Sequence, residues 1–208
     1  MKKFLLPLLL LACLPTLSAQ TAKDILDRTA AKLQQSTGGY SAKFQATSFN
    51  GTREAGSTNG TIEVKGQKFK ITSNGMTTWF DGHTQWSLLA GSDEVNVSTP
   101  SAAEVQQMNP YYLLNAYKQG YTCTIRNADK GGLQRWEVTL SAKRKADFPR
   151  ILLIIDSNYT LQNIRLRDAK GNWMRFRISG VKTGLNLPDS RFRFEKKDYP
   201  GIEVIDLR

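Results

Sequence analysis

The sequence predicts a mainly β protein with a few helices, built around one curved antiparallel sheet of about ten or eleven strands. Short apolar segments with alternating polar residues recur along most of the chain. Asn-Gly, Asp-Gly and Gly-Gly pairs separate these segments, and such pairs form the tight turns that join antiparallel strands. A sheet of this size has to curl because the twist of successive strands accumulates.

The expected strands form two groups, one on each side of a helical middle segment. They are Tyr40–Phe49, Thr61–Ile71 (a hairpin), Met76–Phe80, Thr84–Leu89 and Glu94–Ser98, followed by Tyr121–Arg126, Leu133–Leu140, Arg150–Asp156, Leu161–Arg167 and Trp173–Ser179. The expected turns are at Asn50-Gly51, Asn59-Gly60, Asn74-Gly75, Asp81-Gly82, Lys130-Gly131-Gly132, Ser157-Asn158 and Lys170-Gly171-Asn172. Short turns of this kind favour an up-and-down order of strands.

Three short helices are expected from capping and stop signals. The first starts at a Thr21/Asp24 capping box and ends at Gly38-Gly39, the second covers Ser101–Gln107, and the third starts at Asn109-Pro110 and ends before Gly120. These helices either fill the concave side of the sheet or fill it partly and leave a pocket.

Alternation along the later strands predicts one apolar and one basic face. Trp136, Val138 and Leu140 share a face, as do Met174, Phe176 and Ile178, whereas Arg165, Arg167, Arg175 and Arg177 point the other way. The strand Ile151–Ile155 is apolar on both faces. We therefore expect the N-terminal helix to cover its outer side.

Residues 1–19 have the pattern of a cleavable signal peptide, which leaves residues 20–208 as a single domain. Lys2 and Lys3 precede a short apolar stretch, and Leu17-Ser18-Ala19 is a suitable cleavage site. The apolar stretch is shorter than the roughly 20 residues that span a bilayer. As an alternative, Leu10-Leu11-Ala12-Cys13 resembles a lipobox, which would anchor the protein through a lipidated Cys13.

The mature chain is basic and has one cysteine. Loss of Lys2 and Lys3 lowers the net charge from +11 by two, to +9. An exported basic protein meets anionic lipid head groups, acidic proteins or a cell-surface polymer rather than nucleic acid, although the charge can also serve solubility alone. Cys123 has no partner for a disulfide and is expected to be a small buried apolar residue.

Nothing in the sequence indicates catalysis, a metal or a cofactor. His83 is the only histidine and lies beside an Asp-Gly turn, where an exposed loop is expected. We find no Gly-x-Ser-x-Gly motif, no metal-ligand spacing and no glycine-rich nucleotide loop. The sequence leaves open only an isolated pair of acidic residues that acts on glycans.

An ordered series of short motifs carries a family resemblance. They are Phe44-Gln45, residues 60–69 (GTIEVKGQKF), Asp81-Gly82 with Trp86, Glu94-Val95, Asn109-Pro110, Phe192-Arg193-Phe194 and residues 199–204 (YPGIEV). Together they resemble the LolA-type outer-membrane lipoprotein carriers over nearly the whole mature chain.

The resemblance implies an unclosed antiparallel β-barrel with a helical lid over an apolar cavity, in the periplasm. It also implies a monomer whose partners are acylated lipoproteins, an inner-membrane Lol-type ABC transporter, and an outer-membrane acceptor or the membrane surface. Members of the family often have an arginine that holds the lid shut, and Lys65 stands at the matching position here. Because lysine lacks the planar fork of donors, the resemblance implies a looser or different latch.

Large apolar residues in the resembling segments are the candidates for the cavity and its lid. The cavity candidates are Phe44, Ile62, Val64, Phe69, Ile71, Trp79, Trp86 and Leu88, and the lid candidates are Lys65, Met108, Pro110, Tyr111, Leu113 and Leu114. Alternation groups Ile62 with Val64 and Phe69 with Ile71, and leaves open which pair faces inward. For each candidate, ordinary core is the alternative. For the whole protein, the alternatives are a carrier of free lipid or another small hydrophobic ligand, and a non-carrier interaction module of the cell envelope.

Overall fold

The computed structural model describes residues 21–108 and 110–208, so the expected signal peptide, Cys13 and Asn109 lie outside the described residues. The described residues form twelve strands, two α-helices and three 3-10 helices. The strands are β1 (Tyr40–Asn50), β2 (Arg53–Lys65), β3 (Lys68–Ser73), β4 (Met76–Phe80), β5 (Gln85–Leu89), β6 (Glu94–Ser98), β7 (Tyr121–Asn127), β8 (Arg135–Ala142), β9 (Arg150–Asp156), β10 (Leu161–Arg167), β11 (Trp173–Lys182) and β12 (Glu203–Asp206). The helices are α1 (Ala22–Gln34), α2 (Ala102–Met108), η1 (Pro110–Gln119), η2 (Asp189–Phe192) and η3 (Lys196–Asp198). Within these residues, no helix is long and apolar enough to cross a membrane.

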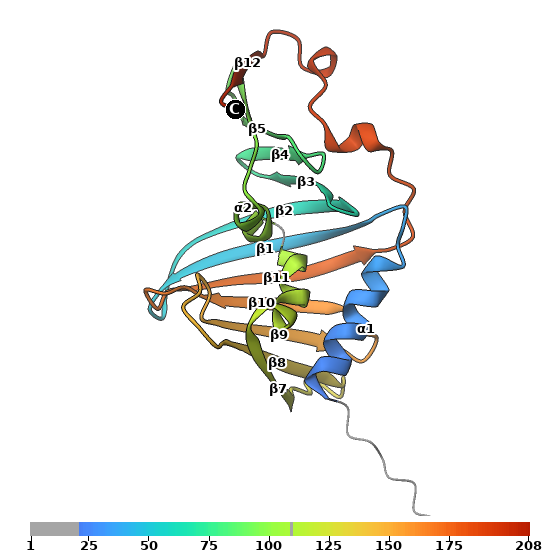
Figure 1. The fold of residues 1–208 in the computed structure, drawn as a ribbon, viewed down its shortest axis with the longest axis vertical. Helices are drawn as coiled ribbons and strands as arrows, with labels where there is room; N and C mark the ends of the chain where they lie inside the picture. Colours follow the sequence, from blue (N-terminus) through green and yellow to red (C-terminus); the bar gives the residue numbers. More distant parts are fainter. Residues whose placement is uncertain (1–20, 109) are drawn as a thin grey trace, which may run out of the picture.

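All twelve strands belong to one curved sheet, in the order β12-β6-β5-β4-β3-β2-β1-β11-β10-β9-β8-β7 (Figure 1). Neighbours pair antiparallel except β12 and β6, which are parallel. β7 and β12 are the two edges, so the sheet is not closed into a barrel. This confirms the expected fold class, with one strand more than the sequence predicted.

The inner face of the sheet is mainly apolar over β8–β10 and β1–β3, and it is polar at β5 and β6, where Ser87 and Asn96 face inward. Strand register aligns the inward residues of β8, β9 and β10, so that Val138, Leu153 and Ile164 lie side by side and are fully buried. Ile25 and Leu26 of α1 belong to the same core. The expectation that the N-terminal helix covers the outer side of β9 is therefore wrong, because its apolar side packs against the larger apolar face on the inside.

Helix α1 begins as its capping box predicts and is tied to the sheet by two long cationic side chains, Arg28 and Lys32. The Thr21 amide donates to Asp24 Oδ2 (3.1 Å), and the Asp24 amide donates to Thr21 Oγ1 (3.2 Å). Further along, Arg28 donates to the Tyr159 hydroxyl (2.9 Å), and Lys32 Nζ donates to the Asn158 carbonyl (2.8 Å), both in the β9–β10 turn. These contacts fix the helix over β7–β10, as Figure 1 shows.

The region predicted as the Thr61–Ile71 hairpin differs from the prediction in its first strand. β2 begins at Arg53, and the expected turn at Asn59-Gly60 is regular strand instead. The actual β2–β3 turn contains Gly66, whose φ of 59° suits glycine. Its register pairs Ile62 with Ile71 and Val64 with Phe69, so both pairs face inward.

Gly60 lies inside β2 because Phe44 occupies the space of its missing side chain. A Cβ atom at Gly60 would lie 2.4 Å from Phe44 Cζ and 2.5 Å from the Thr72 carbonyl oxygen. Glycine in a strand interior often marks such a close approach. The Asn-Gly pair is therefore a packing feature here and not a turn.

The segment between β6 and β7 crosses the inner face of the sheet. β6 and β7 lie near opposite edges, and α2 and η1 run between them in front of the central strands (Figure 1). Ser101 caps α2, since its amide donates to Glu104 Oε2 (2.8 Å) and the Glu104 amide donates to its hydroxyl (3.3 Å). Leu113 and Leu114 of η1 are buried against the sheet.

The C-terminal segment after β11 runs along one end of the strands and over the outer face to β12. Three sets of ion pairs attach it to the β2–β4 region, namely Asp189 with Lys65 and Lys68, Arg191 with Glu63, and Arg193 with Asp81. Phe192 and Phe194 alternate with these charged residues and are buried. The segment is therefore a packed part of the domain.

We predict that Gly60→Ala lowers the free energy of unfolding by about 1–3 kcal/mol, because the added methyl group forces the Phe44 ring and the β3 backbone away. Gly56→Ala on the same strand is the matched control, since its nearest contact would be Ser48 Oγ at 3.7 Å. The control should change stability by about 0.5 kcal/mol or less. Urea denaturation followed by circular dichroism measures both, and equal stability of the two variants would contradict the close approach.

Candidate functional site

An apolar hollow of about 210 Å³ lies between the inner face of the sheet and α2. Its walls come from β1, β2, β3 and β11, and Met108 of α2 closes one side. The apolar lining residues are Ala42, Phe44, Ala46, Ile62, Ile71, Met108, Phe176 and Ile178. Lys43, Thr58 and Ser73 complete the lining.

Small side chains on β1 create this hollow. The inward residues of β1 include Ala42 and Ala46 on either side of Phe44, and the Phe44 ring lies over Gly60. Phe176 faces it edge-on across the β1–β11 pair, with ring centroids 6.5 Å apart. Two alanines next to two aromatic rings leave an irregular apolar space that longer side chains would fill.

A second hollow of about 390 Å³ lies under the junction of α1 and η1. Leu33, Tyr40, Val64 and Leu114 supply much of its apolar lining, while Gln34, Ser36, Thr37 and Asn115 make it partly polar. Val64 and Ile62 are successive inward residues of β2, so the two hollows follow each other along the same strand. Together they occupy the space on either side of the crossing segment.

The crossing segment is held to α1 by a latch that the sequence did not reveal. The Tyr117 hydroxyl of η1 donates a hydrogen bond to Asp27 Oδ1 of α1. Burial and the nearby carboxylate raise the pKa of Tyr117, so the hydroxyl stays protonated and continues to donate. Lys118 Nζ lies 3.7 Å from the same oxygen, a half-exposed pair that adds little.

The predicted lid residues divide into three groups. Leu113, Leu114 and Met108 pack on the inner face of the sheet beneath or beside the hollows. The side chains of Pro110 and Tyr111 lie outside the described residues, although the backbone of both belongs to η1. Among the described residues, the polar contacts of Lys65 go to the C-terminal segment and not to the crossing segment.

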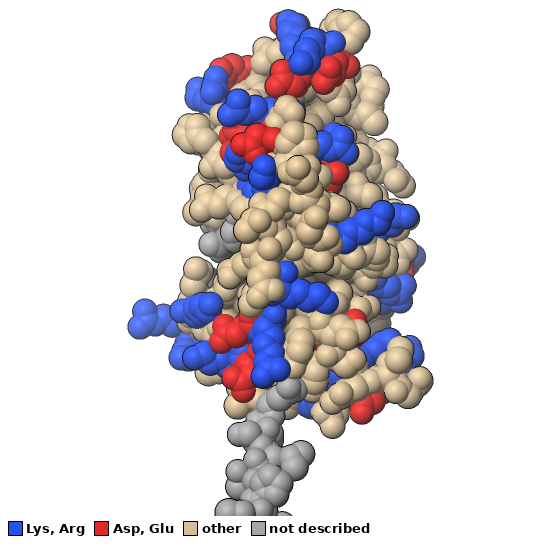
Figure 2. Space-filling model, turned by 90° about the vertical axis from the view of Figure 1, so that its right-hand side faces the viewer, with Lys and Arg blue, Asp and Glu red and all other residues tan. Residues whose placement is uncertain are grey.

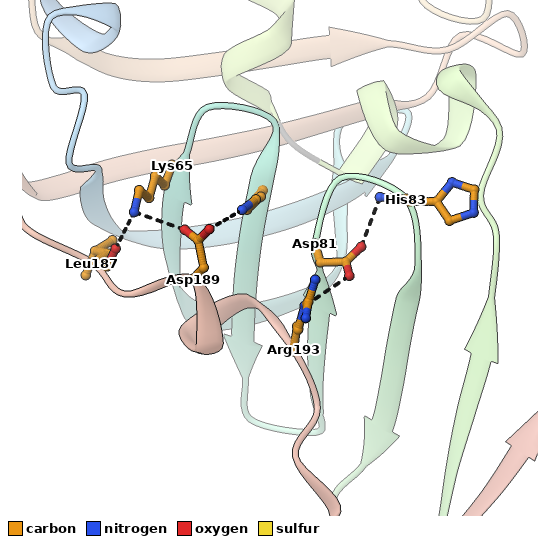
Figure 3. Close-up of polar contacts among 7 residues, drawn as sticks. Lys65, Asp81, His83, Leu187, Asp189 and Arg193 are labelled. Atoms are coloured by element: carbon orange, nitrogen blue, oxygen red, sulfur yellow. Dashed lines mark hydrogen bonds and ion pairs between the residues drawn. The ribbon is translucent and has the colours of Figure 1, made fainter.

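Lys65 instead holds the C-terminal segment on the outer face (Figure 3). Its Nζ donates to the Leu187 carbonyl (2.8 Å) and lies 3.0 Å from Asp189 Oδ1. Hydrogen bonds from Lys68 and Lys65 lower the pKa of Asp189 to about 2. The sequence predicts Lys65 as a lid residue, and this placement corrects it, because the Lys65 side chain alternates with inward Val64 and points to the other face.

Five of the predicted cavity residues lie on the inner face of the sheet. Phe44, Ile62 and Ile71 line the first hollow, and Val64 lines the second. Phe69 is fully buried and packs against Phe80, with ring centroids 5.1 Å apart. Phe69 is therefore core, which was the alternative interpretation.

Trp79, Trp86 and Leu88 lie on the outer face and cannot line the same space. Register pairs Trp79 with Trp86, one position away from inward Phe80. These residues form a second apolar cluster with Val95, and Phe194, Tyr199 and Ile202 of the C-terminal segment cover it. The Trp79 ring centroid is 5.8 Å from that of Phe194 and 5.7 Å from that of Tyr199.

The described residues show no arrangement suited to catalysis. They contain no group of three or more His, Cys, Asp or Glu residues placed to hold a metal. Figure 3 shows the exposed His83 side chain pointing away from Asp81, whose carboxylate accepts from the backbone amides of His83 (3.0 Å) and Thr84 (2.8 Å). Cys123 is a free, half-buried thiol packed against the main core.

A curved unclosed sheet, with apolar hollows between its inner face and a helical cover, is the architecture of a protein that binds hydrophobic ligands. The family model described as outer membrane lipoprotein carrier protein LolA matches residues 14–170, well over half of the chain. The chain therefore belongs to this family. A comparison with curated proteins finds no match.

Comparison with solved structures finds several similar chains. An uncharacterized conserved protein from Thermus thermophilus has a TM-score of 0.59 and 15% identity, over 89% of this chain and 98% of that chain. The LolA superfamily protein NE2245 from Nitrosomonas europaea has a TM-score of 0.44 and 12% identity over 85% and 99% of the two chains. The lipoprotein LppX from Mycobacterium tuberculosis has a TM-score of 0.43 and 12% identity over 79% and 96%.

We predict that Tyr117→Phe increases the open population of the crossing segment about tenfold or more, because it removes a hydrogen bond to a carboxylate worth about 1.5 kcal/mol or more. Hydrogen exchange of the amides of residues 113–119 measures the effect. Tyr121→Phe is the matched control, since its hydroxyl donates to the Phe148 carbonyl (3.0 Å) near the β8–β9 turn. Unchanged exchange in Tyr117→Phe would show that the latch does not hold the cover.

Proposed function

We propose that this protein is a periplasmic carrier that shields the acyl chains of lipoproteins and delivers them from the inner to the outer membrane. The observation that supports this most directly is the apolar hollow around Phe44 and Ile62, under a cover that a side-chain latch ties to α1. Membership of the lipoprotein carrier family supports the same cargo class. The expected signal peptide at residues 1–19 supports the compartment.

The energetics of acyl chains require a carrier rather than free diffusion. Each methylene moved out of water is worth about 0.8 kcal/mol, so a sixteen-carbon chain represents on the order of 10 kcal/mol. A carrier that bound such a chain as tightly as full burial allows could not release it. Irregular walls such as Phe44, Phe176 and Met108 suit the task, because they accept flexible chains without requiring one geometry.

Transfer requires the cover to move. The hollow of about 210 Å³ is smaller than the roughly 300–1,000 Å³ of pockets that hold drug-sized ligands. A 3-10 helix as long as the ten residues of η1 has poorer hydrogen-bond geometry than an α-helix and is uncommon at this length. A cover built this way rearranges at lower cost than a packed α-helix.

The proposed partners follow from this cycle. An inner-membrane Lol-type ABC transporter would supply the acylated lipoprotein, and an outer-membrane acceptor or the membrane surface would receive it. We propose that the carrier acts as a monomer and without catalysis. The small volume of the hollow favours, as the second candidate, a carrier of free lipid or another small hydrophobic ligand.

Mass spectrometry of the protein purified from its own host without detergent tests the proposal. Co-purified acylated polypeptide supports the lipoprotein carrier, and co-purified free lipid supports the second candidate. Displacement of a fluorescent fatty acid provides a second readout. Absence of both bound species together with no saturable binding of the probe would contradict both candidates and favour a non-carrier interaction module.

We predict that Ala46→Phe weakens binding of the fluorescent fatty acid about tenfold or more, because the added ring fills the hollow and overpacking costs about 1–3 kcal/mol. Trp86→Leu is the control, since Trp86 belongs to the cluster on the outer face. This control should bind the probe like the wild type. Equal loss of binding in both variants would indicate a general effect on folding, which circular dichroism would detect.

A further inference from the structure

The outer face of β1, β10 and β11 is strongly basic. These three neighbouring strands contain no Asp or Glu, and besides Lys182 at the end of β11 their outward positions present five cationic side chains. We call this set the basic outer face, and it consists of Lys43, Arg165, Arg167, Arg175 and Arg177. Lys43, Arg165, Arg167 and Arg177 are exposed, whereas Arg175 is partly buried.

The position of these cations beside one another is electrostatically unfavourable. Arg165 and Arg175 are directly opposite in register on β10 and β11, and like charges in that position are destabilising. Arg177 is paired with Asn163 and bonds the uncharged Gln45 (3.1 Å). The buried Nε of Arg175 has no hydrogen-bond partner in the described part of the chain.

The acidic residues on the flanking strands are mostly engaged elsewhere. Glu63 on β2 accepts a bidentate pair of hydrogen bonds from Arg191 (2.8 and 3.1 Å), and Glu137 on β8 accepts from Arg126 (2.6 Å). Asp156 accepts from the amides of the β9–β10 turn. Glu54, in register with Phe49 at the end of β2, is the acidic residue nearest to the face along the pairing. The positive charge of the basic outer face is therefore largely uncompensated.

Two aromatic residues and a shallow polar depression belong to the same face. Arg165 lies over the Trp173 ring at 4.8 Å and Arg175 over the Phe49 ring at 5.0 Å. An open depression of about 710 Å³ has Lys43, Arg177 and Asn59 in its lining and no carboxylate. Guanidinium groups bind phosphate through paired hydrogen bonds, and Trp is enriched at membrane interfaces.

The side of the molecule in Figure 2 offers a contrast. Lys and Arg are interspersed there with Asp and Glu instead of being gathered on one surface. The C-terminal segment on the outer face illustrates this mixture, because Arg191 and Arg193 are each paired with a carboxylate. The excess of cations on β1, β10 and β11 is thus a local property of that sheet face.

We propose that the basic outer face docks onto a bilayer surface that carries anionic phospholipid head groups. A protein partner generally requires an apolar centre with few charges, and here charge occupies the centre of the face. A lipid surface instead attracts a cluster of Lys and Arg electrostatically, with aromatic side chains at its margin. Docking by the outer face leaves the hollows and the crossing segment, on the opposite side of the sheet, free to act.

Sedimentation with vesicles of equal parts phosphatidylglycerol and phosphatidylcholine tests this proposal with the full mature chain. Each charge near the membrane surface contributes on the order of 1 kcal/mol to binding, and each 1.4 kcal/mol changes the partition coefficient about tenfold. The double variant Arg165→Gln/Arg177→Gln should therefore partition about thirtyfold more weakly than the wild type. The double variant Lys196→Gln/Lys197→Gln is the matched control. It removes the same charge from the exposed helix η3 and should bind like the wild type.

Three results would overturn the proposal. They are equal binding of wild type and the Arg165/Arg177 variant, equal weakening in both double variants, and equal binding of the wild type to pure phosphatidylcholine vesicles. A polyglutamate peptide provides a further test. If it binds the wild type more tightly than the vesicles do and displaces them, the partner is an acidic protein, and the proposal is overturned. The vesicles contain no acylated cargo, so the outcome does not depend on the proposed carrier function. Unchanged circular dichroism of both variants excludes unfolding as the cause.

Discussion

The connection from β6 to β7 is the constraint on which the rest of the structure depends. These strands lie near opposite edges of the sheet, so the intervening segment must cross one of its faces. It crosses the inner face because the main apolar cluster is there, and it buries Leu113 and Leu114 in doing so. A single crossing segment and α1 do not cover that face completely. Hollows therefore remain on both sides of the crossing, beside Phe44 and beside Tyr40.

The outward residues of the sheet and their cover differ between the two ends of the outer face. On β4–β6 the outward residues are apolar, and the C-terminal segment covers them with Phe194, Tyr199 and Ile202. Its ion pairs alternate with its buried aromatic residues, so charge and burial hold the same stretch of chain in place. On β1, β10 and β11 the outward residues are cationic and have no such cover. The same sheet thus separates an apolar inside from a basic outside in its middle. On β5 and β6 the apolar residues face outward, and polar residues such as Ser87 and Asn96 face inward.

Sequence patterns predicted the fold well wherever one face of a strand was apolar and a glycine turn followed. They failed at Asn59-Gly60, because a glycine that makes room for the Phe44 ring looks the same in sequence as a glycine in a turn. They also failed at Trp79, since strands β4 and β5 carry large apolar residues on both faces and alternation cannot choose between them. The latch between Tyr117 and Asp27 joins residues 90 positions apart. A local sequence pattern cannot predict such a contact, because the contact depends on the position of the crossing segment in the fold.

The closed hollow and its weak cover fit a protein that has to release what it binds. Within the proposed function, a cargo larger than about 210 Å³ has to displace the crossing segment. Displacement moves Leu113 and Leu114 away from the sheet, into water or against the cargo. Opening the cover therefore costs free energy, and part of the free energy of cargo binding offsets that cost. A tightly closing cover would reject acyl chains, and an absent one would hold them with the full free energy of burial. A 3-10 segment with a hydrogen-bonded latch lies between these limits. It lets the carrier give up its cargo to an acceptor whose apolar surface is only slightly more favourable.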